Sequence, residues 1–145
     1  MTLSIQDSKY SFSFILLMHS LRVPYFNVPW ILYIIIKEVL ISLVSSTLYE
    51  SNCIGTFFNH MLKEMNKWQN ITVYKQECLD TIGFDSNNVK TSKDPIDHKK
   101  YKEWYDWWIK DIDHGIKMVF EWDYIEARNG CDFIKQVLNS YPNKI

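Results

Sequence analysis

The stretch from Asp94 to Gly115 constrains the fold most, because it contains both ends and the buried face of one long amphipathic helix. Asp94 is suited to cap the first turn, Pro95 fits the first helical position, and Gly115 predicts a left-handed end. Five large apolar residues fall within a narrow arc and predict the core stripe: Tyr101, Trp104, Tyr105, Trp108 and Ile112. A helix with such a stripe needs other apolar elements to pack against.

The opposite side of this predicted helix carries the candidate binding residues. Trp107 lies outside the core stripe, with Glu103 one turn before it and Asp111 one turn after it. Residues 94–132 hold ten acidic and six basic side chains, a local net charge of −4. An exposed Trp among acids is typical of an anchor for a basic partner, although another helix covering Trp107 is an equal alternative. The candidate partner-binding residues are Glu103, Asp106, Trp107, Asp111 and Asp113.

Further apolar segments predict an all-α fold, a single-domain bundle of about five to six helices over residues 1–145. The other segments expected to be helical cover residues 10–23, 28–50, 51–68, 70–83 and 133–141. We expect the apolar face of each segment to be buried, together with Trp30 and Trp68. Residues 85–93 form a polar linker inside this domain, too short to establish a second one.

Residues 116–124 are ambiguous, because large apolar side chains alternate there as they do in a strand. Val119 and Ile125 interrupt the polar face of that pattern, so we expect an irregular or short extended segment within the all-α fold. An α+β fold with a small hairpin is the alternative. Asn129-Gly130 predicts a turn before the last helix.

The cysteines indicate a reducing compartment. Cys53, Cys78 and Cys131 are widely spaced and follow neither a disulfide pattern nor a zinc pattern. Asp7 lies ahead of the first apolar run, and neither a basic leader nor a small-residue cleavage site accompanies that run, so a signal peptide is not expected. We therefore expect a cytoplasmic protein.

The segment 28–49 raises the question of a membrane, because it is long enough to span one. Lys37 and Glu38 stand at its middle, where each charge costs roughly 2.5 to 3.5 kcal/mol on insertion scales. Each Leu or Ile returns only about 0.3 to 0.6 kcal/mol on the same scales. A soluble core helix is the favoured interpretation, and a small membrane-associated protein held by this helix is an alternative hypothesis.

Chemical sites receive less support from the sequence. Asp111, Asp113 and His114 offer oxygen and imidazole ligands for a metal-dependent enzyme, but acids on a solvated helix face with a terminal histidine are expected without catalysis. Cys53 and His60 share a helical face but stand roughly 10 Å apart along it, beyond hydrogen-bond reach. We therefore predict no enzyme, no metal site and no cofactor.

The favoured functional hypothesis is a non-enzymatic cytosolic protein-binding module. An acidic helix with an aromatic anchor would mask a basic surface, as an immunity protein or antitoxin does when it inhibits a nuclease toxin. The same acidic surface repels phosphate, and the chain has only two arginines, Arg22 and Arg128. Direct binding of nucleic acid is therefore not expected.

Overall fold

The computed structural model describes residues 4–79, 81–84 and 96–142, and every regular element within these ranges is helical. In chain order the elements are α1 (Ile5–Ser20), α2 (Val28–Ser42), the 3-10 helix η1 (Leu43–Ser45), α3 (Leu48–Lys67), α4 (Ile71–Glu77), α5 (His98–Phe120), α6 (Tyr124–Val137) and the 3-10 helix η2 (Leu138–Ser140). The predicted all-α fold is confirmed, and the alternative with a hairpin is wrong for these ranges. The linker predicted at 85–93 lies outside the described residues.

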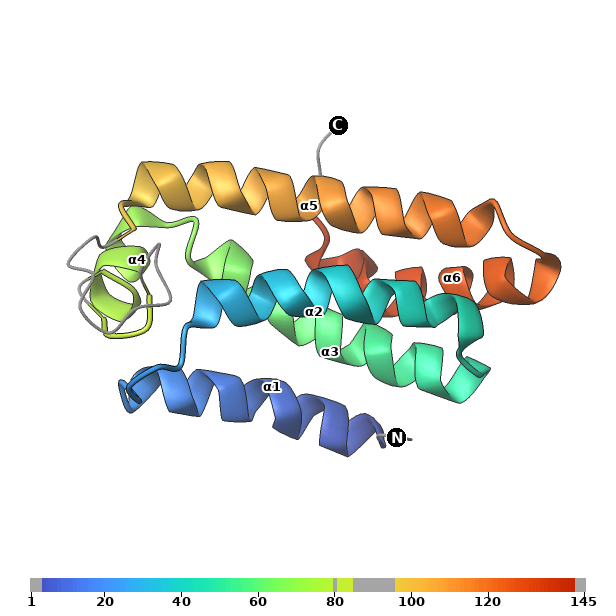
Figure 1. The fold of residues 1–145 in the computed structure, drawn as a ribbon, viewed down its shortest axis with the longest axis horizontal. Coiled ribbons are helices and arrows are strands. Elements are labelled where there is room, and N and C mark those ends of the chain that lie inside the picture. Colours follow the sequence, from blue (N-terminus) through green and yellow to red (C-terminus); the bar gives the residue numbers. More distant parts are fainter. Residues whose placement is uncertain (1–3, 80, 85–95, 143–145) are drawn as a thin grey trace.

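Four helices form the body of the molecule. α5 lies along one edge and α1 along the opposite edge, with α2 and α3 between them (Figure 1). α2 and α5 run in the same direction, whereas α1 runs the opposite way to α2. α6 turns back from the end of α5 and packs against α3, which is the central helix. The inner residues of α3 are closed off from solvent: Phe58, Met61, Leu62 and Met65.

Polar side chains start five of the described helices by accepting a hydrogen bond from a backbone N–H two or three residues later. These capping residues are Ser4, Asn27, Thr47, Asn70 and Asp97. α2 begins at residue 28 as predicted, whereas α1 and α3 begin before the predicted starts at residues 10 and 51. α5 begins after Asp97, and the predicted cap Asp94 and Pro95 lie outside the described residues.

The core stripe predicted for α5 is largely confirmed. Tyr101, Tyr105, Trp108 and Ile112 are buried, and Trp104 is half-buried. The buried tyrosines also satisfy their hydroxyl groups, since Tyr101 donates to the carbonyl of Met65 at 2.7 Å and Tyr105 donates to the side-chain oxygen of Asn66. These bonds join the first half of α5 to the end of α3.

The predicted end of this helix at Gly115 is wrong, because α5 continues to Phe120. Gly115 lies where α5 approaches α2, and a Cβ atom added to it would stand 3.1 Å from Cδ1 of Leu40. Among the described glycines only Gly83 has a positive φ, of 84°. The glycine at 115 therefore marks a close approach between helices and not a left-handed cap.

The extended segment predicted near 116–124 is also wrong, because α5 occupies its first part and α6 begins at Tyr124. The turn predicted at Asn129-Gly130 lies inside α6, and both residues are buried. The Asn129 amide donates to the carbonyl of Ser46 at 2.6 Å, while Gly130 lets α6 approach the end of α5. Packing between helices has overridden the local turn signal.

Candidate functional site

The outer face of α5 carries the five residues predicted to bind a partner. Trp107 is 60% exposed, so no described part of the chain covers it. Glu103 and Asp106 are also exposed, whereas Asp111 and Asp113 are half-buried and each holds a bond to another part of the molecule. The structure divides these residues between the two flanks of α5.

Asp111 lies on the flank that faces α2. Its carboxylate forms an ion pair with Lys37 at 2.9 Å, and the Lys37 amino group lies 5.9 Å from the centre of the Tyr33 ring. Lys37 is exposed and Asp111 keeps partial contact with solvent, so the pair contributes less than about 1 kcal/mol to stability. The pair shows the register of the two helices, because it marks the level at which α2 and α5 face each other.

This register places exposed aromatic residues of two helices on one surface. Tyr33 lies one turn before Lys37 on α2, and Trp107 lies one turn before Asp111 on α5. Because the two helices run in the same direction, both rings lie toward the helix N-termini from the Lys37–Asp111 pair. Trp30 and Tyr33 stack with ring centres 5.3 Å apart and are 47% and 39% exposed. We name the residues of this region the α2–α5 surface: Trp30, Tyr33, Lys37, Glu103, Trp107 and Asp111.

The α2 half of this surface was not predicted, and the prediction that Trp30 is buried in the core is wrong. A usable signal was present. Lys37 follows Tyr33 by one turn and Trp30 by two turns, and a lysine in an apolar helix marks its solvated arc. Tyr33 and Trp30 share that arc.

Asp106 and Asp113 lie on the other flank of α5, seven residues apart. Asp113 accepts a hydrogen bond from the hydroxyl group of Tyr141, which follows η2. Burial and this bond raise the pKa of Tyr141 above its ordinary value. Asp113 therefore attaches the last described segment to α5, and the structure does not bring it to Trp107.

The metal-site alternative depended on Asp111, Asp113 and His114. Within the described ranges, no group of three or more histidine, cysteine, aspartate or glutamate side chains is placed to hold a metal ion. Asp111 and Asp113 point to opposite flanks of α5. The Asp111 carboxylate pairs with Lys37, and the Asp113 carboxylate accepts the hydrogen bond from Tyr141. The geometry offers this hypothesis no support.

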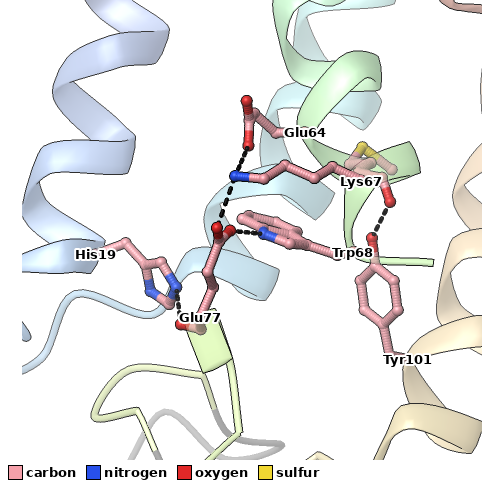
Figure 2. Close-up of polar contacts among 7 residues, drawn as sticks. His19, Glu64, Lys67, Trp68, Glu77 and Tyr101 are labelled. Atoms are coloured by element: carbon pink, nitrogen blue, oxygen red, sulfur yellow. Dashed lines mark hydrogen bonds and ion pairs between the residues drawn. The ribbon is translucent and has the colours of Figure 1, made fainter. Parts of the chain in front are cut away.

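A second polar cluster surrounds Glu77 at the end of α4 (Figure 2). The Glu77 carboxylate accepts a hydrogen bond from the Trp68 indole N–H at 2.9 Å and pairs with the Lys67 amino group at 2.7 Å. Its backbone carbonyl lies 2.9 Å from Nε2 of His19, and Lys67 reaches Glu64 at 3.4 Å. These contacts join α1, α3 and α4.

The pKa shifts in this cluster follow from burial and from the bonds that hold α1, α3 and α4 together. Burial lowers the pKa of His19, and Arg22 adds to this effect while Glu77 opposes it. A carbonyl oxygen only accepts, so Nε2 of the neutral ring carries the proton, and the buried Nδ1 has no hydrogen-bond partner among the described residues. Burial opposes ionisation of Glu77, but hydrogen bonds from Lys67 and Trp68 outweigh it and hold its pKa below the ordinary value.

Among the described residues, α2 and η1 form the one helical segment apolar enough to raise the question of a membrane. With η1 it covers residues 28–45, a segment long and apolar enough to cross a membrane by length and composition, criteria that core helices also meet. Only 33% of that segment is buried. The prediction of a core helix therefore holds for its inner face alone, while Trp30, Tyr33, Ile34 and Ile41 are exposed on the outer face.

Comparison with known families gives a match over nearly the whole chain. The model of the Tho2 family, described as transcription factor/nuclear export subunit protein 2, matches residues 1–144. The chain therefore belongs to the Tho2 family. No curated protein and no solved structure shows significant similarity to it.

Family membership corrects two predictions. The immunity protein or toxin inhibitor is wrong, because the family is described as a transcription factor and nuclear export subunit. The cytoplasmic location is wrong for the same reason, since nuclear export begins in the nucleus. The coarser prediction holds, because a subunit associates with other proteins and a protein-interaction module fits that role. The absence of enzymatic activity stays a prediction.

Proposed function

We propose that this Tho2-family chain is a non-enzymatic protein-interaction region of a transcription and nuclear export subunit, and that its α2–α5 surface binds a basic segment of a partner protein. The observation that carries the proposal is the exposure of Trp107 between two acids on a regular helix. Tryptophan is enriched among the residues that dominate binding energy. A Trp held on a helix contributes contact area without the cost of ordering a loop.

The two acids beside Trp107 are the groups that a cationic partner would contact, although Lys37 and the exposed Lys110 lie near them. Glu103 is exposed one turn before Trp107, and Asp111 is half-buried one turn after it. An arginine or lysine of a partner can compete with Lys37 for Asp111, because that ion pair is solvated and weak. Acids at the border of an interface raise the association rate of a basic partner and make it depend on salt.

The aromatic residues of α2 extend the contact area. Trp30 and Tyr33 present stacked rings beside the Lys37–Asp111 pair, so the α2–α5 surface combines an apolar centre with charged borders. This arrangement matches protein interfaces, in which aromatic residues are enriched at the centre and charges stay at the rim. A phosphate backbone lacks the cationic groups that such a border would attract.

The test compares two tryptophans of similar exposure. Trp107→Ala removes the proposed anchor, whereas Trp122→Ala removes a residue that is 58% exposed in the turn between α5 and α6. Partners captured from nuclear extract by the wild-type chain are identified, and their affinities for the purified variants are measured by titration. Trp107→Ala should weaken binding by about 30-fold or more, and Trp122→Ala should leave it within about twofold.

A charge reversal tests the sign of the partner. Glu103→Lys should weaken the same complex and flatten its salt dependence, because it replaces an attractive charge with a repulsive one. Unchanged affinity in both Trp107→Ala and Glu103→Lys would exclude the α2–α5 surface as the binding site. A partner that binds Glu103→Lys more tightly would be acidic, which contradicts the proposed chemistry.

A further inference from the structure

The outer face of α1 carries an apolar stripe that the described residues leave largely exposed. α1 lies along the edge of the molecule opposite α5 (Figure 1). Four large side chains, between 44% and 70% exposed, form the stripe: Tyr10, Phe14, Leu17 and Leu21. At 100° per residue they fall within an arc of about 60°, on the side of α1 away from the buried Phe12 and His19. Their spacing of four, three and four residues is that of the a and d positions of a coiled coil, which pack against a second helix.

The surroundings of the stripe are uncharged and can be covered without losing hydrogen bonds. Its neighbours on the helix surface are Ser11, Ser13, Met18 and Ser20. Each serine hydroxyl donates to the carbonyl of a residue three or four positions earlier in α1, at 2.7 to 2.9 Å. These donors stay bonded when another surface excludes water from them, so burial of this face leaves no hydroxyl unsatisfied. The base within α1, Lys9, projects about 130° from the centre of the stripe.

The stripe fits a second copy of the same chain better than an unlike partner. Charges beside the seam select a particular partner in coiled coils, and α1 has none there. The stripe is also complementary to itself, because its first half is the stacked pair of Tyr10 and Phe14, and its second half consists of two leucines. If a second copy is related by a twofold axis between Phe14 and Leu17, the two rings of each copy face the leucines of the other. Each bulky half then meets a smaller one.

The area of the stripe is sufficient for a weak dimer. With about 200 Å² for each large side chain, the four members expose about 450 Å² in each copy. Two stripes therefore bury about 900 Å². The flanking serines and Met18 add to this, so the total reaches about 1,000 Å² or more, the lower limit for a specific interface. An interface of this size predicts micromolar affinity.

We propose that two copies of this chain form an antiparallel dimer through the α1 stripe, with the twofold axis between Phe14 and Leu17. In this orientation the positive end of each helix dipole lies beside the negative end of the other. It also sets Asp7 of each copy at the same end as Arg22 of the partner subunit, whereas a parallel pair would set each charge beside its own kind. The stripe lies on the opposite edge from the α2–α5 surface, so the dimer and the function proposed above can fail separately.

Sedimentation equilibrium of the full chain measures the dimer. The wild type should dimerise with a Kd between about 1 and 100 μM. Leu17→Glu buries a charge near the axis and should raise the Kd by at least about tenfold. Leu138→Glu is the matched control, because Leu138 is a leucine of η2 that is 64% exposed, and it should change the Kd by less than about twofold. If circular dichroism shows that Leu17→Glu is unfolded, Ser13→Arg replaces it, since residue 13 is exposed beside the stripe.

A charge swap tests whether the partner is the same surface. The two residues at position 17 lie within one turn of each other across the axis, so Leu17→Glu and Leu17→Lys should each be mainly monomeric. An equimolar mixture of these two variants should dimerise at least about tenfold more tightly than either variant alone, because opposite charges then meet.

Disulfide trapping tests the orientation. The exposed Cys131 is first replaced by serine, while Cys53 and Cys78 are buried and stay in place. A mixture of Tyr10→Cys and Leu21→Cys should form a mixed disulfide-linked dimer on mild oxidation, because residues 10 and 21 face each other in the antiparallel pair. Each variant alone should stay largely unlinked. Linkage of each variant to itself, and not to the other, would overturn the antiparallel dimer.

Three results overturn the proposal as a whole. The first is a wild type that stays monomeric at about 300 μM, well above the expected Kd. The second is a dimer that neither Leu17→Glu nor Ser13→Arg weakens, because another surface then forms it. The third is a monomeric wild type whose binding to a protein captured from nuclear extract is lost in Leu17→Glu, because that protein is then the occupant of the stripe.

Discussion

The contact between α3 and α6 gives a prediction whose sign depends on two opposing effects. Gly55 lies in the third turn of α3, and replacing a helical glycine with alanine ordinarily stabilises a protein by up to about 1 kcal/mol. At this position the added Cβ atom would stand 2.8 Å from Cβ of Gln136 and 3.1 Å from the carbonyl oxygen of Phe133. Carbon atoms in favourable contact are about 3.5 to 4.0 Å apart.

The steric cost should exceed the gain in helix propensity. Both nearby atoms belong to or adjoin the α6 backbone, so a rotamer change cannot relieve the overlap, and α6 must move away from α3. That movement would disturb the Phe58–Phe133 ring contact and the hydrogen bond from Gln136 to Asn52. Overpacking of this kind costs about 1 to 3 kcal/mol, so Gly55→Ala should destabilise the chain by about 1 kcal/mol net.

The measurement is urea unfolding followed by circular dichroism, with thermal unfolding as a second readout. Gly55→Ala should lower the melting temperature by about 2 to 4 °C. Gly115→Ala is the matched control, because its added Cβ atom meets mainly the side chain of Leu40, which can shift by a few tenths of an ångström. Gly115→Ala should be near neutral or stabilising. If Gly55→Ala raised stability as much as Gly115→Ala, the close approach of α3 and α6 would be refuted.

Two further predictions concern the polar cluster at the end of α4. Glu77→Ala should lower the free energy of unfolding, measured by urea titration, by about 1 to 2 kcal/mol, because it leaves the buried Trp68 indole N–H without an acceptor. Glu77→Gln keeps an acceptor for that N–H and should lower the free energy of unfolding by less. Stability should also fall as pH drops below the ordinary histidine value of 6.5, because burial lowers the pKa of His19 in the folded state and the unfolded chain then binds more protons. Burial also lowers the pKa of His60, so the pH series is measured in a His60→Gln variant to remove that contribution. If a further His19→Gln change left the slope of unfolding free energy against pH unaltered, His19 would not be the group responsible.

The sequence predicted those elements whose local signals agree with their packing. α5 combines a stripe of aromatic residues with a polar outer face, and both features survive in the structure. The helix predicted from residue 28 begins there for the same reason, because Asn27 caps its first turn. Periodicity and capping are local properties, so a single sequence is sufficient to find them.

The wrong predictions fall where a distant segment determines the local structure. A helix end was predicted at Gly115 and a turn at Asn129-Gly130, but all three residues lie inside helices. The two glycines allow close contact with α2 and with the end of α5, and Asn129 donates a hydrogen bond to Ser46. The candidate site shows the same limitation. Periodicity placed Trp107 outside the core stripe, but it gave no information about Lys37, the partner of Asp111, which lies 74 residues earlier in the chain.

The composition of α2 has a physical explanation in the different surroundings of its faces. A membrane span is apolar on every side, whereas α2 carries Lys37 and Glu38 at its middle, pointing about 100° apart. Lys37 borders the α2–α5 surface through its pair with Asp111, and Glu38 is exposed on the other flank of α2. The inner arc of α2 packs in the core, and each remaining flank combines apolar residues with one charge. A helix that packs its inner arc in a core and exposes aromatic and aliphatic residues on its outer face meets the length and composition criteria of a membrane span.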